Sequence, residues 1–72
     1  MQGGVGLIKN RVKELRARFD YTQGELADIV GVTRQTIVAL EKGSYTPSLL
    51  LAMNLAEVFK LPIEEIFTKE ES

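Results

Sequence analysis

The segment 23–43 constrains the fold of this chain most, because two amphipathic helical patterns meet there at a very short corner. Apolar or methyl-bearing side chains recur at helical spacing on both sides of the corner, at Leu26, Ala27, Val30, Thr33, Ile37 and Leu40. Gly31 ends the first pattern, where a left-handed backbone conformation costs little only for glycine. Ala27 is expected where the helices cross, because a larger side chain would push them apart. The segment therefore predicts one helix over 23–30 and a second over 33–42.

Two helices joined in this way form a helix-turn-helix, an arrangement that places its second helix in the major groove of DNA. The face of the second helix that the packing leaves free carries Arg34 and Gln35, side-chain types that read base edges. An ordinary helical hairpin in a small bundle is the alternative interpretation of the spacing. The polar chemistry of the second helix favours DNA binding.

The composition limits what else the chain can do. With 72 residues and no cysteine or histidine, we expect one small domain without a disulfide, a metal or another cofactor. Acid–base catalysis would depend on exposed carboxylates such as Glu64 and Glu65 without a nucleophile, so we expect no enzyme. No apolar run is long enough to cross a membrane and no signal-peptide pattern is present, which predicts a cytoplasmic protein without a membrane partner. Nothing in the sequence indicates a small-molecule ligand.

The formal net charge of −1 is unusual for a DNA-binding chain, but the charges are unevenly distributed. Residues 1–48 hold seven basic and five acidic side chains, whereas residues 49–72 hold two basic and five acidic ones. The asymmetry indicates a basic end that faces phosphate and an acidic end that faces away. Surface charge that segregates by chance is the alternative. A modest local charge implies weak non-specific binding, so specificity would depend on base contacts.

The remaining patterns predict three more helices. A helix over 7–19 would bury one stripe of side chains, at Ile8, Val12, Leu15 and Phe19. Thr22 and Glu25 form a capping box at the start of the helix over 23–30. A helix over 49–59, capped by Ser48 or Thr46, would bury Leu49, Ala52, Leu55, Ala56 and Phe59. Pro62 begins a short fifth helix.

Five helices with short connections predict an all-α orthogonal bundle over residues 7–67. Residues 1–6 are glycine-rich and are interpreted as a flexible lead. Residues 68–72 are interpreted as an acidic, frayed tail.

Four motifs, all in register, resemble the phage-repressor (Cro-like, xenobiotic response element) family of helix-turn-helix regulators. They are Thr22-Gln23-x-Glu25-Leu26-Ala27, Gly31-Val32-Thr33-Arg34-Gln35-Thr36-Ile37, Leu40-Glu41-Lys42-Gly43 and Tyr45-x-Pro47-Ser48. The resemblance covers residues 7–67 and is to the short, single-domain members. It implies a five-helix bundle of the phage-repressor DNA-binding-domain type and a sequence-specific transcriptional regulator. As in some short relatives, residues 5–7 and 66–68 could pair as a small two-stranded sheet.

The resemblance also implies roles for individual residues. Base edges would be contacted by Thr33, Arg34, Gln35, Val38 and Ala39. Phosphates would be bound by Gln23, Thr36, Lys42, Ser44, Tyr45 and Thr46. Arg34 suits guanine O6 and N7, and Gln35 suits adenine N6 and N7. For Val38, contact with a thymine methyl group and packing in the core are both open.

Two structural features follow from the same resemblance. Arg16 would pair with Glu41 and lock the reading helix, over 33–42, to the body of the domain. A homodimer would form through the fifth helix and its flanks, with candidate contacts at Leu50, Met53, Leu61, Pro62, Ile63, Ile66 and Phe67. A twofold dimer would set two reading helices about 34 Å apart on double-stranded DNA, which demands an inverted-repeat operator. The interpretation is a dimeric repressor; a protein-interaction module of the same fold, antitoxin-like or bridging, is the alternative.

Overall fold

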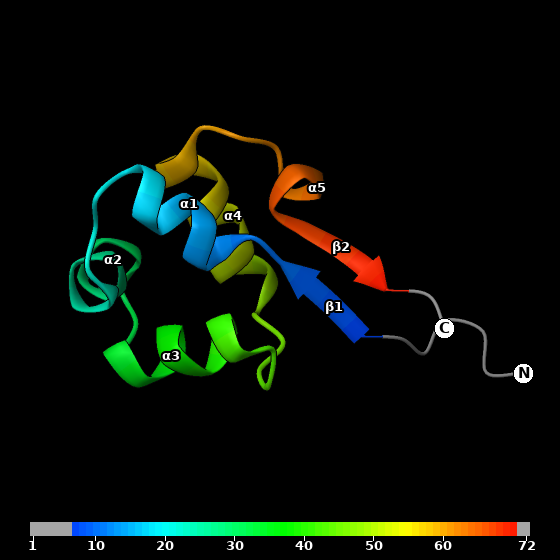
Figure 1. The fold of residues 1–72 in the computed structure, drawn as a ribbon, viewed down its shortest axis with the longest axis horizontal. Helices are drawn as coiled ribbons and strands as arrows, with labels where there is room; N and C mark the ends of the chain where they lie inside the picture. Colours follow the sequence, from blue (N-terminus) through cyan, green and yellow to red (C-terminus); the bar gives the residue numbers. More distant parts are fainter. Residues whose placement is uncertain (1–6, 71–72) are drawn as a thin grey trace, which may run out of the picture.

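The computed structural model describes residues 7–70 (Figure 1). The elements in chain order are β1 (Leu7–Asn10), α1 (Val12–Arg18), α2 (Gln23–Val30), α3 (Arg34–Lys42), α4 (Leu49–Phe59), α5 (Ile63–Ile66) and β2 (Phe67–Glu70). Within these residues the fold is a bundle of five helices with one small antiparallel sheet. The predicted fold class is therefore confirmed.

The α2–α3 unit is built on local capping chemistry. The Thr22 hydroxyl accepts a hydrogen bond from the Glu25 amide at 3.0 Å, and the Glu25 carboxylate accepts one from the Thr22 amide at 2.8 Å, which completes the predicted capping box. Gly31 ends α2 with φ of 78°. Thr33 caps α3 through its hydroxyl, and Gly43 ends α3 with φ of 84°. Both glycines adopt the left-handed conformation that other residues reach only with strain.

One apolar core holds the five helices together. Its side chains are almost completely inaccessible to solvent at Val12, Leu15, Leu26, Ala27, Ile37, Leu40, Leu55, Phe59 and Ile66. Ala27 is 1% exposed, as expected for a small residue at a helix crossing. Each large side chain in such a core contributes about 1.5–3 kcal/mol through burial, which is substantial for a domain of this size.

The predicted helix over 7–19 is wrong in its N-terminal part. Leu7–Asn10 forms β1, and α1 begins only at Val12. Asn10 lies at the change of direction: its Oδ1 accepts a hydrogen bond from the Val12 amide at 3.0 Å, and its Nδ2 donates to the Leu40 carbonyl at 2.9 Å. A short polar side chain that satisfies backbone groups locally competes with helix formation. This local bond and the pairing of Leu7–Asn10 with β2 together override the helical spacing before Val12.

The buried stripe of α1 is shorter than predicted. Val12 and Leu15 are fully buried, as the helical spacing indicates. Ile8 is 39% exposed and belongs to β1, not to α1. Phe19 is 36% exposed at the C-cap of α1, where its ring stacks on Tyr21 at a centroid distance of 6.2 Å.

The inward face of α4 is rotated from the predicted one. Leu51 is 4% exposed, whereas Leu49, which was expected to face inward, is 71% exposed. Ala52, Leu55 and Phe59 are buried as predicted, and they lie on the helical stripe of Leu51. Leu49 lies about a quarter turn outside that stripe, so its side chain remains in solvent.

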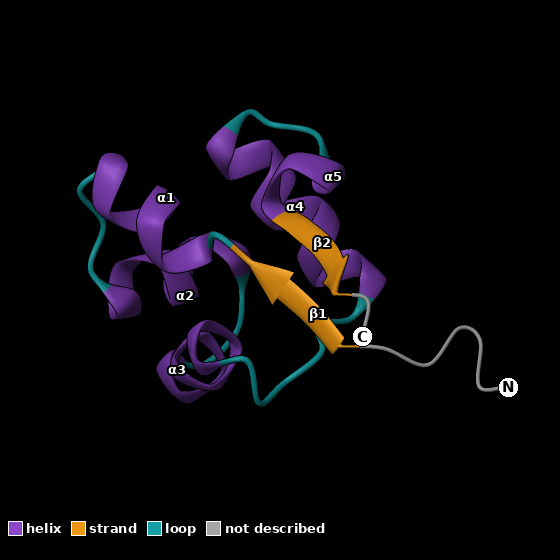
Figure 2. Cartoon of the chain, turned by 45° about the vertical axis from the view of Figure 1, so that its right-hand side comes forward, coloured by secondary structure: helices purple, strands orange, loops and turns teal. Residues whose placement is uncertain are grey.

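The two strands pair antiparallel, with Leu7 opposite Glu70 and Asn10 opposite Phe67. A sheet of two strands was expected, but between residues 5–7 and 66–68. Residues 1–6 and 71–72 lie outside the described residues. They include part of the expected first strand, the whole of the predicted lead and the end of the predicted tail. Since residues 68–70 belong to β2, the prediction of a frayed tail is wrong for them. Figure 2 shows the strands side by side, with β1 leading into α1 and β2 following α5.

Two kinds of feature are absent from residues 7–70. No helix in this range is long and apolar enough to cross a membrane. No group of three or more metal-ligating side chains gathers in the same range.

We predict that Leu51→Ala and Leu49→Ala differ sharply in stability. Leu51→Ala should lower the free energy of unfolding by about 2–5 kcal/mol, because it leaves a cavity in the core. Leu49→Ala should change it by less than about 0.5 kcal/mol, because that side chain is exposed. Urea denaturation followed by circular dichroism measures both. Equal losses of stability in the two variants would contradict the burial of Leu51 and the exposure of Leu49.

Candidate nucleic-acid interface

The outer face of α3 carries most of the side chains that the sequence predicts to contact DNA. A shallow hollow of about 220 Å³ lies on this face. Its lining consists of Arg34, Gln35, Val38, Ala39, Lys42 and Ser44. All six belong to the predicted set, four as base contacts and two as phosphate contacts. The fold thus brings both kinds of residue onto one surface.

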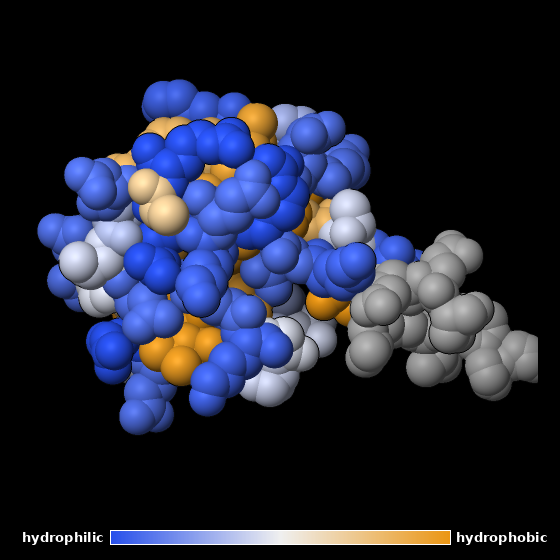
Figure 3. Space-filling view, viewed as in Figure 1, coloured by the Kyte–Doolittle hydropathy of each residue, from blue (hydrophilic) through white to orange (hydrophobic). Residues whose placement is uncertain are grey.

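The chemistry of this face is mixed. Arg34, Gln35 and Lys42 are exposed, and Val38 and Ala39 are half-buried. Figure 3 shows apolar surface over α3 set among hydrophilic side chains. Val38 lines the hollow and is not part of the buried core or of the shell packed against it. The major-groove edges of base pairs present hydrogen-bond acceptors, donors and the thymine methyl group, and a mixed surface of this kind can match them.

The other predicted contacts flank the hollow in the sequence. At the start of α3, the Thr33 and Thr36 hydroxyl oxygens lie 3.1 Å apart, and Thr33 also caps the helix. After α3, the Ser44 hydroxyl donates to the Ala39 carbonyl at 3.2 Å. Tyr45 and Thr46 follow on the segment before α4 and are exposed, but they do not line the hollow.

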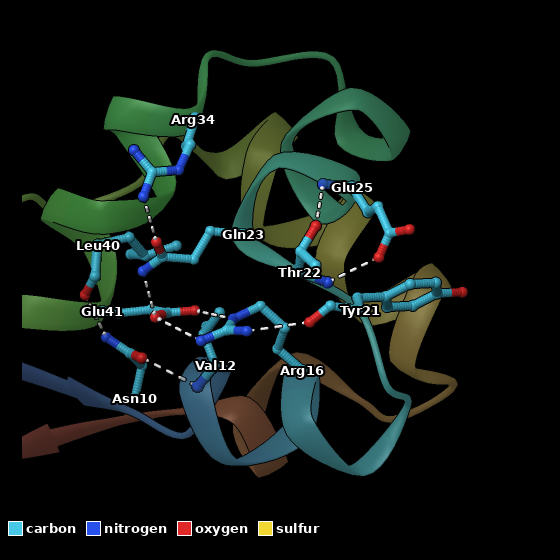
Figure 4. Close-up of polar contacts among 10 residues, drawn as sticks. All are labelled: Asn10, Val12, Arg16, Tyr21, Thr22, Gln23, Glu25, Arg34, Leu40 and Glu41. Carbon is cyan, nitrogen blue, oxygen red and sulfur yellow. Dashed lines mark hydrogen bonds and ion pairs between the residues drawn. The ribbon is translucent and has the colours of Figure 1, made fainter.

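An ion pair connects α3 to α1 (Figure 4). Arg16 Nε donates to Glu41 Oε2 at 2.7 Å, and Arg16 Nη2 donates to Glu41 Oε1 at 3.3 Å. A third donor, Nη1, reaches the Tyr21 carbonyl at 2.9 Å. The Glu41 side chain is only 5% exposed and that of Arg16 is 16% exposed. The guanidinium fork matches the carboxylate with two bonds, and this satisfies a charge that would otherwise be costly to bury.

Gln23, in the first turn of α2, extends this network to the start of α3. Its Nε2 donates to Glu41 Oε1 at 3.1 Å, and its Oε1 accepts from Arg34 Nη2 at 3.3 Å. The side chain was expected to bind phosphate. In the protein alone it is engaged at both ends of its amide (Figure 4).

Asn10 is a supporting residue that sequence analysis did not identify. Its bond to the Leu40 carbonyl joins the β1–α1 corner to the last turn of α3. Its bond to the Val12 amide, two residues further on, is a local contact of the kind that asparagine side chains often make. Its partner on α3 lies 30 residues away, and no local pattern indicates that contact.

The residues predicted to form a dimer interface do not all share one environment. Leu50 and Met53 are 69% and 51% exposed on the outer side of α4. Pro62 is exposed, and Leu61, Ile63 and Phe67 are half-buried. Ile66 is 1% exposed. The prediction for Ile66 is wrong, because α5 directs this side chain into the core.

A second group of charges joins the start of α1 to α5. Arg11 forms two hydrogen bonds with Glu14, at 3.3 and 3.0 Å, and donates to the Glu65 carbonyl at 2.9 Å. The hydrogen bond from Arg11 lowers the pKa of Glu14 below its usual value, and the same bond raises the pKa of Arg11. The side chains of Arg11 and Glu14 are both exposed, so their ion pair is a surface contact and not a reactive site. Arg11 also links the start of α1 to α5.

Comparison with known proteins establishes the class. The helix-turn-helix family model matches residues 12–66, and the chain belongs to this family. The class is one of DNA-binding transcription regulators and is not enzymatic.

The relatives agree with this assignment. The chain is 56% identical over 64 residues to the uncharacterised HTH-type transcriptional regulator YgzD of Bacillus subtilis, covering 89% of this chain and 97% of that one. It is 32% identical over 66 residues to the cryptic phage CTXphi transcriptional repressor RstR of Vibrio cholerae, covering 92% of this chain and 60% of RstR. Among solved structures, the restriction-modification controller protein C.AhdI of Aeromonas hydrophila is similar with a TM-score of 0.70 and 29% identity, covering 76% of this chain and 80% of that one.

We predict that Glu41→Ala lowers the free energy of unfolding by about 2–4 kcal/mol, because it leaves the Arg16 guanidinium partly buried and unpaired. Thermal unfolding followed by circular dichroism measures the loss. Glu14→Ala is the control: it also removes a glutamate paired with arginine, but at an exposed site, and should leave the midpoint almost unchanged. Equal effects would mean that the Arg16–Glu41 pair does not anchor α3.

Proposed function

We propose that this protein is a cytoplasmic, homodimeric repressor that binds an inverted-repeat operator in double-stranded DNA through α3. The observation that supports this best is the hollow on α3, because its six lining side chains are those expected to contact bases and phosphates. Every residue assigned a DNA role lies within 7–67, the range proposed for the DNA-binding domain. The relative RstR is named a transcriptional repressor, which supports repression over activation.

Base contacts are assigned to Thr33, Arg34, Gln35, Val38 and Ala39. Arg34 and Gln35 are exposed near the start of α3, where the end of a recognition helix enters the major groove. Their side chains can each form two hydrogen bonds to one purine. Val38 lies about one turn further on and supplies the apolar contact for a thymine methyl group.

Phosphate contacts are assigned to residues around the two ends of α3, namely Gln23, Thr36, Lys42, Ser44, Tyr45 and Thr46. Lys42 and the exposed hydroxyls after it lie on the C-terminal side of the helix. Contacts at both ends would fix the register of α3 in the groove, while the bases between them determine the sequence.

The dimer is proposed to form through α4, α5 and the residues beside them. Leu50 and Met53 are large apolar side chains left in solvent on the outer side of α4, and burial against a second copy would remove them from water. Leu61, Pro62, Ile63 and Phe67 complete the proposed surface, and Ile66 does not. A twofold axis there would present two α3 helices to successive major grooves.

Selection of bound sequences from random duplex DNA tests the proposal, with the bound complex sized on the same sample. An inverted repeat with half-sites about one helical turn apart, bound by two chains, is the expected result. Salt-sensitive binding without an enriched sequence would contradict it and support a protein-interaction module instead.

We predict that Arg34→Ala and Gln35→Ala each reduce operator binding by about 1–3 kcal/mol per half-site and relax specificity at one base pair. Fluorescence anisotropy with the selected operator and its single-base variants measures both effects. Unchanged affinity for Arg34→Ala would show that α3 does not read the sequence.

The matched control is Lys60→Gly, which also removes one positive charge. Lys60 caps the C-terminal end of α4 with φ of 57°, a conformation that glycine adopts easily. That end of α4 lies at the top of Figure 1 and α3 lies at the bottom. Operator affinity and specificity should stay close to those of the unmodified protein.

A further inference from the structure

The ribbon formed by β1 and β2 is attached to the end of α3, and this attachment orients its two faces. At the end of β1, Asn10 donates a hydrogen bond to the Leu40 carbonyl in the last turn of α3 at 2.9 Å. Successive side chains of a strand point to opposite faces, so Ile8 shares the face of Asn10 and Lys9 occupies the other face. One face of the ribbon is therefore turned toward the C-terminal end of α3.

The register of the two strands places Lys69 on this same face. Lys69 is paired with Ile8, and Asn10 is paired with Phe67. Residues directly opposite each other in an antiparallel pair lie on one face, and diagonal neighbours on that face are about 7–8 Å apart. Lys69 is thus a diagonal neighbour of Asn10 on the α3 side of the ribbon, and its side chain is exposed.

The loop that follows α3 lies beside the ribbon. Figure 1 and Figure 2 both show the connection between α3 and α4 next to β1. This connection carries Ser44, Tyr45 and Thr46, which are assigned to phosphate contacts, and Lys42 ends the helix before it. Lys69 therefore extends the proposed phosphate-binding surface from the end of α3 onto the ribbon.

The charge of Lys69 suits this place. The charge pattern of the sequence predicts that residues 49–72 face away from DNA, and Lys69 is one of only two basic residues among them. The pairing of β2 with β1 brings this lysine back toward the C-terminal end of α3. A lysine ammonium on its flexible stem binds phosphate as a point charge, so it does not need the fixed geometry of an arginine fork.

We propose that Lys69 is a further phosphate contact, made from the ribbon to the DNA backbone beyond the C-terminal end of α3. The contact adds affinity and helps to fix the position of the protein, but it carries no sequence information. The inference rests on the proposed function of α3 as the reading helix.

Lys69→Gln and Lys9→Gln form a matched pair that tests the proposal. Each removes one positive charge from an exposed side chain of the ribbon, but from opposite faces. Fluorescence anisotropy gives the dissociation constant (Kd) of the selected operator over a range of salt concentrations. We expect Lys69→Gln to lower the slope of log Kd against log salt by about 0.9 for each bound chain, and Lys9→Gln to change it little. Equal slopes for the two variants would overturn the inference.

Two further measurements separate the phosphate contact from other roles of Lys69. Lys69→Arg keeps the charge and should keep the slope of the unmodified protein. The loss of affinity in Lys69→Gln should be the same on the operator and on its single-base variants, because phosphates are present in every sequence. If Lys69→Gln instead changes the number of bound chains and leaves the slope unchanged, the lysine supports the dimer, and the inference is overturned.

Duplex DNA of arbitrary sequence separates this inference from the proposed function. The same difference in slope between Lys69→Gln and Lys9→Gln is expected there, because counterion release does not depend on sequence. If that difference is found but no operator is enriched, the phosphate contact is supported and the proposed sequence-specific repressor fails. Absence of any binding to DNA would overturn both.

Discussion

The orientation of α3 depends on a carboxylate, that of Glu41, which is almost completely removed from water. The corner at Gly31 holds the N-terminal end of α3, and Glu41 attaches its last turn to α1 and α2. Arg16 binds both oxygens of this carboxylate, and Gln23 binds one of them. Burying a charge is costly, and these bonds offset the cost only in one geometry. The same bonds that stabilise the domain therefore also hold the C-terminal end of α3 against α1 and α2.

The side chains of α3 divide between the core and the outward face. The apolar core lies on one side of α3, with Ile37 and Leu40 fully buried, while the opposite face presents polar donors and Val38 around the hollow. Asn10 adds a second attachment by binding the Leu40 carbonyl at the end of the helix. Both ends of α3 are thus held by hydrogen bonds and its middle by apolar packing. Such pre-organisation reduces the entropy that a base-reading surface loses on binding.

Local chemistry explains which parts of the fold the sequence predicts. Thr22, Glu25 and Thr33 act on amides within three residues of themselves, and the left-handed glycines end helices by their own backbone freedom. The sequence misplaces Ile8 and Leu49 because their environments depend on contacts with distant parts of the chain. Ile8 fits a helical stripe, but β2, which arrives from the far end of the chain, pairs with its segment. Leu49 fits the spacing of α4, yet the neighbouring helices cover the stripe of Leu51 instead.

The sequence by itself determined the helix-turn-helix, the caps of α2 and α3, and the residue types on the reading face, since each of these depends on short-range spacing. It also indicated the Arg16–Glu41 pair, through resemblance to a family. Only the tertiary structure decided that Asn10 supports α3 and that the Gln23 amide lies between Glu41 and Arg34. These depend on side chains that are distant in sequence and meet only when the core closes. The periodicity of a chain specifies its elements, whereas the geometry of a shared polar network follows from how those elements pack.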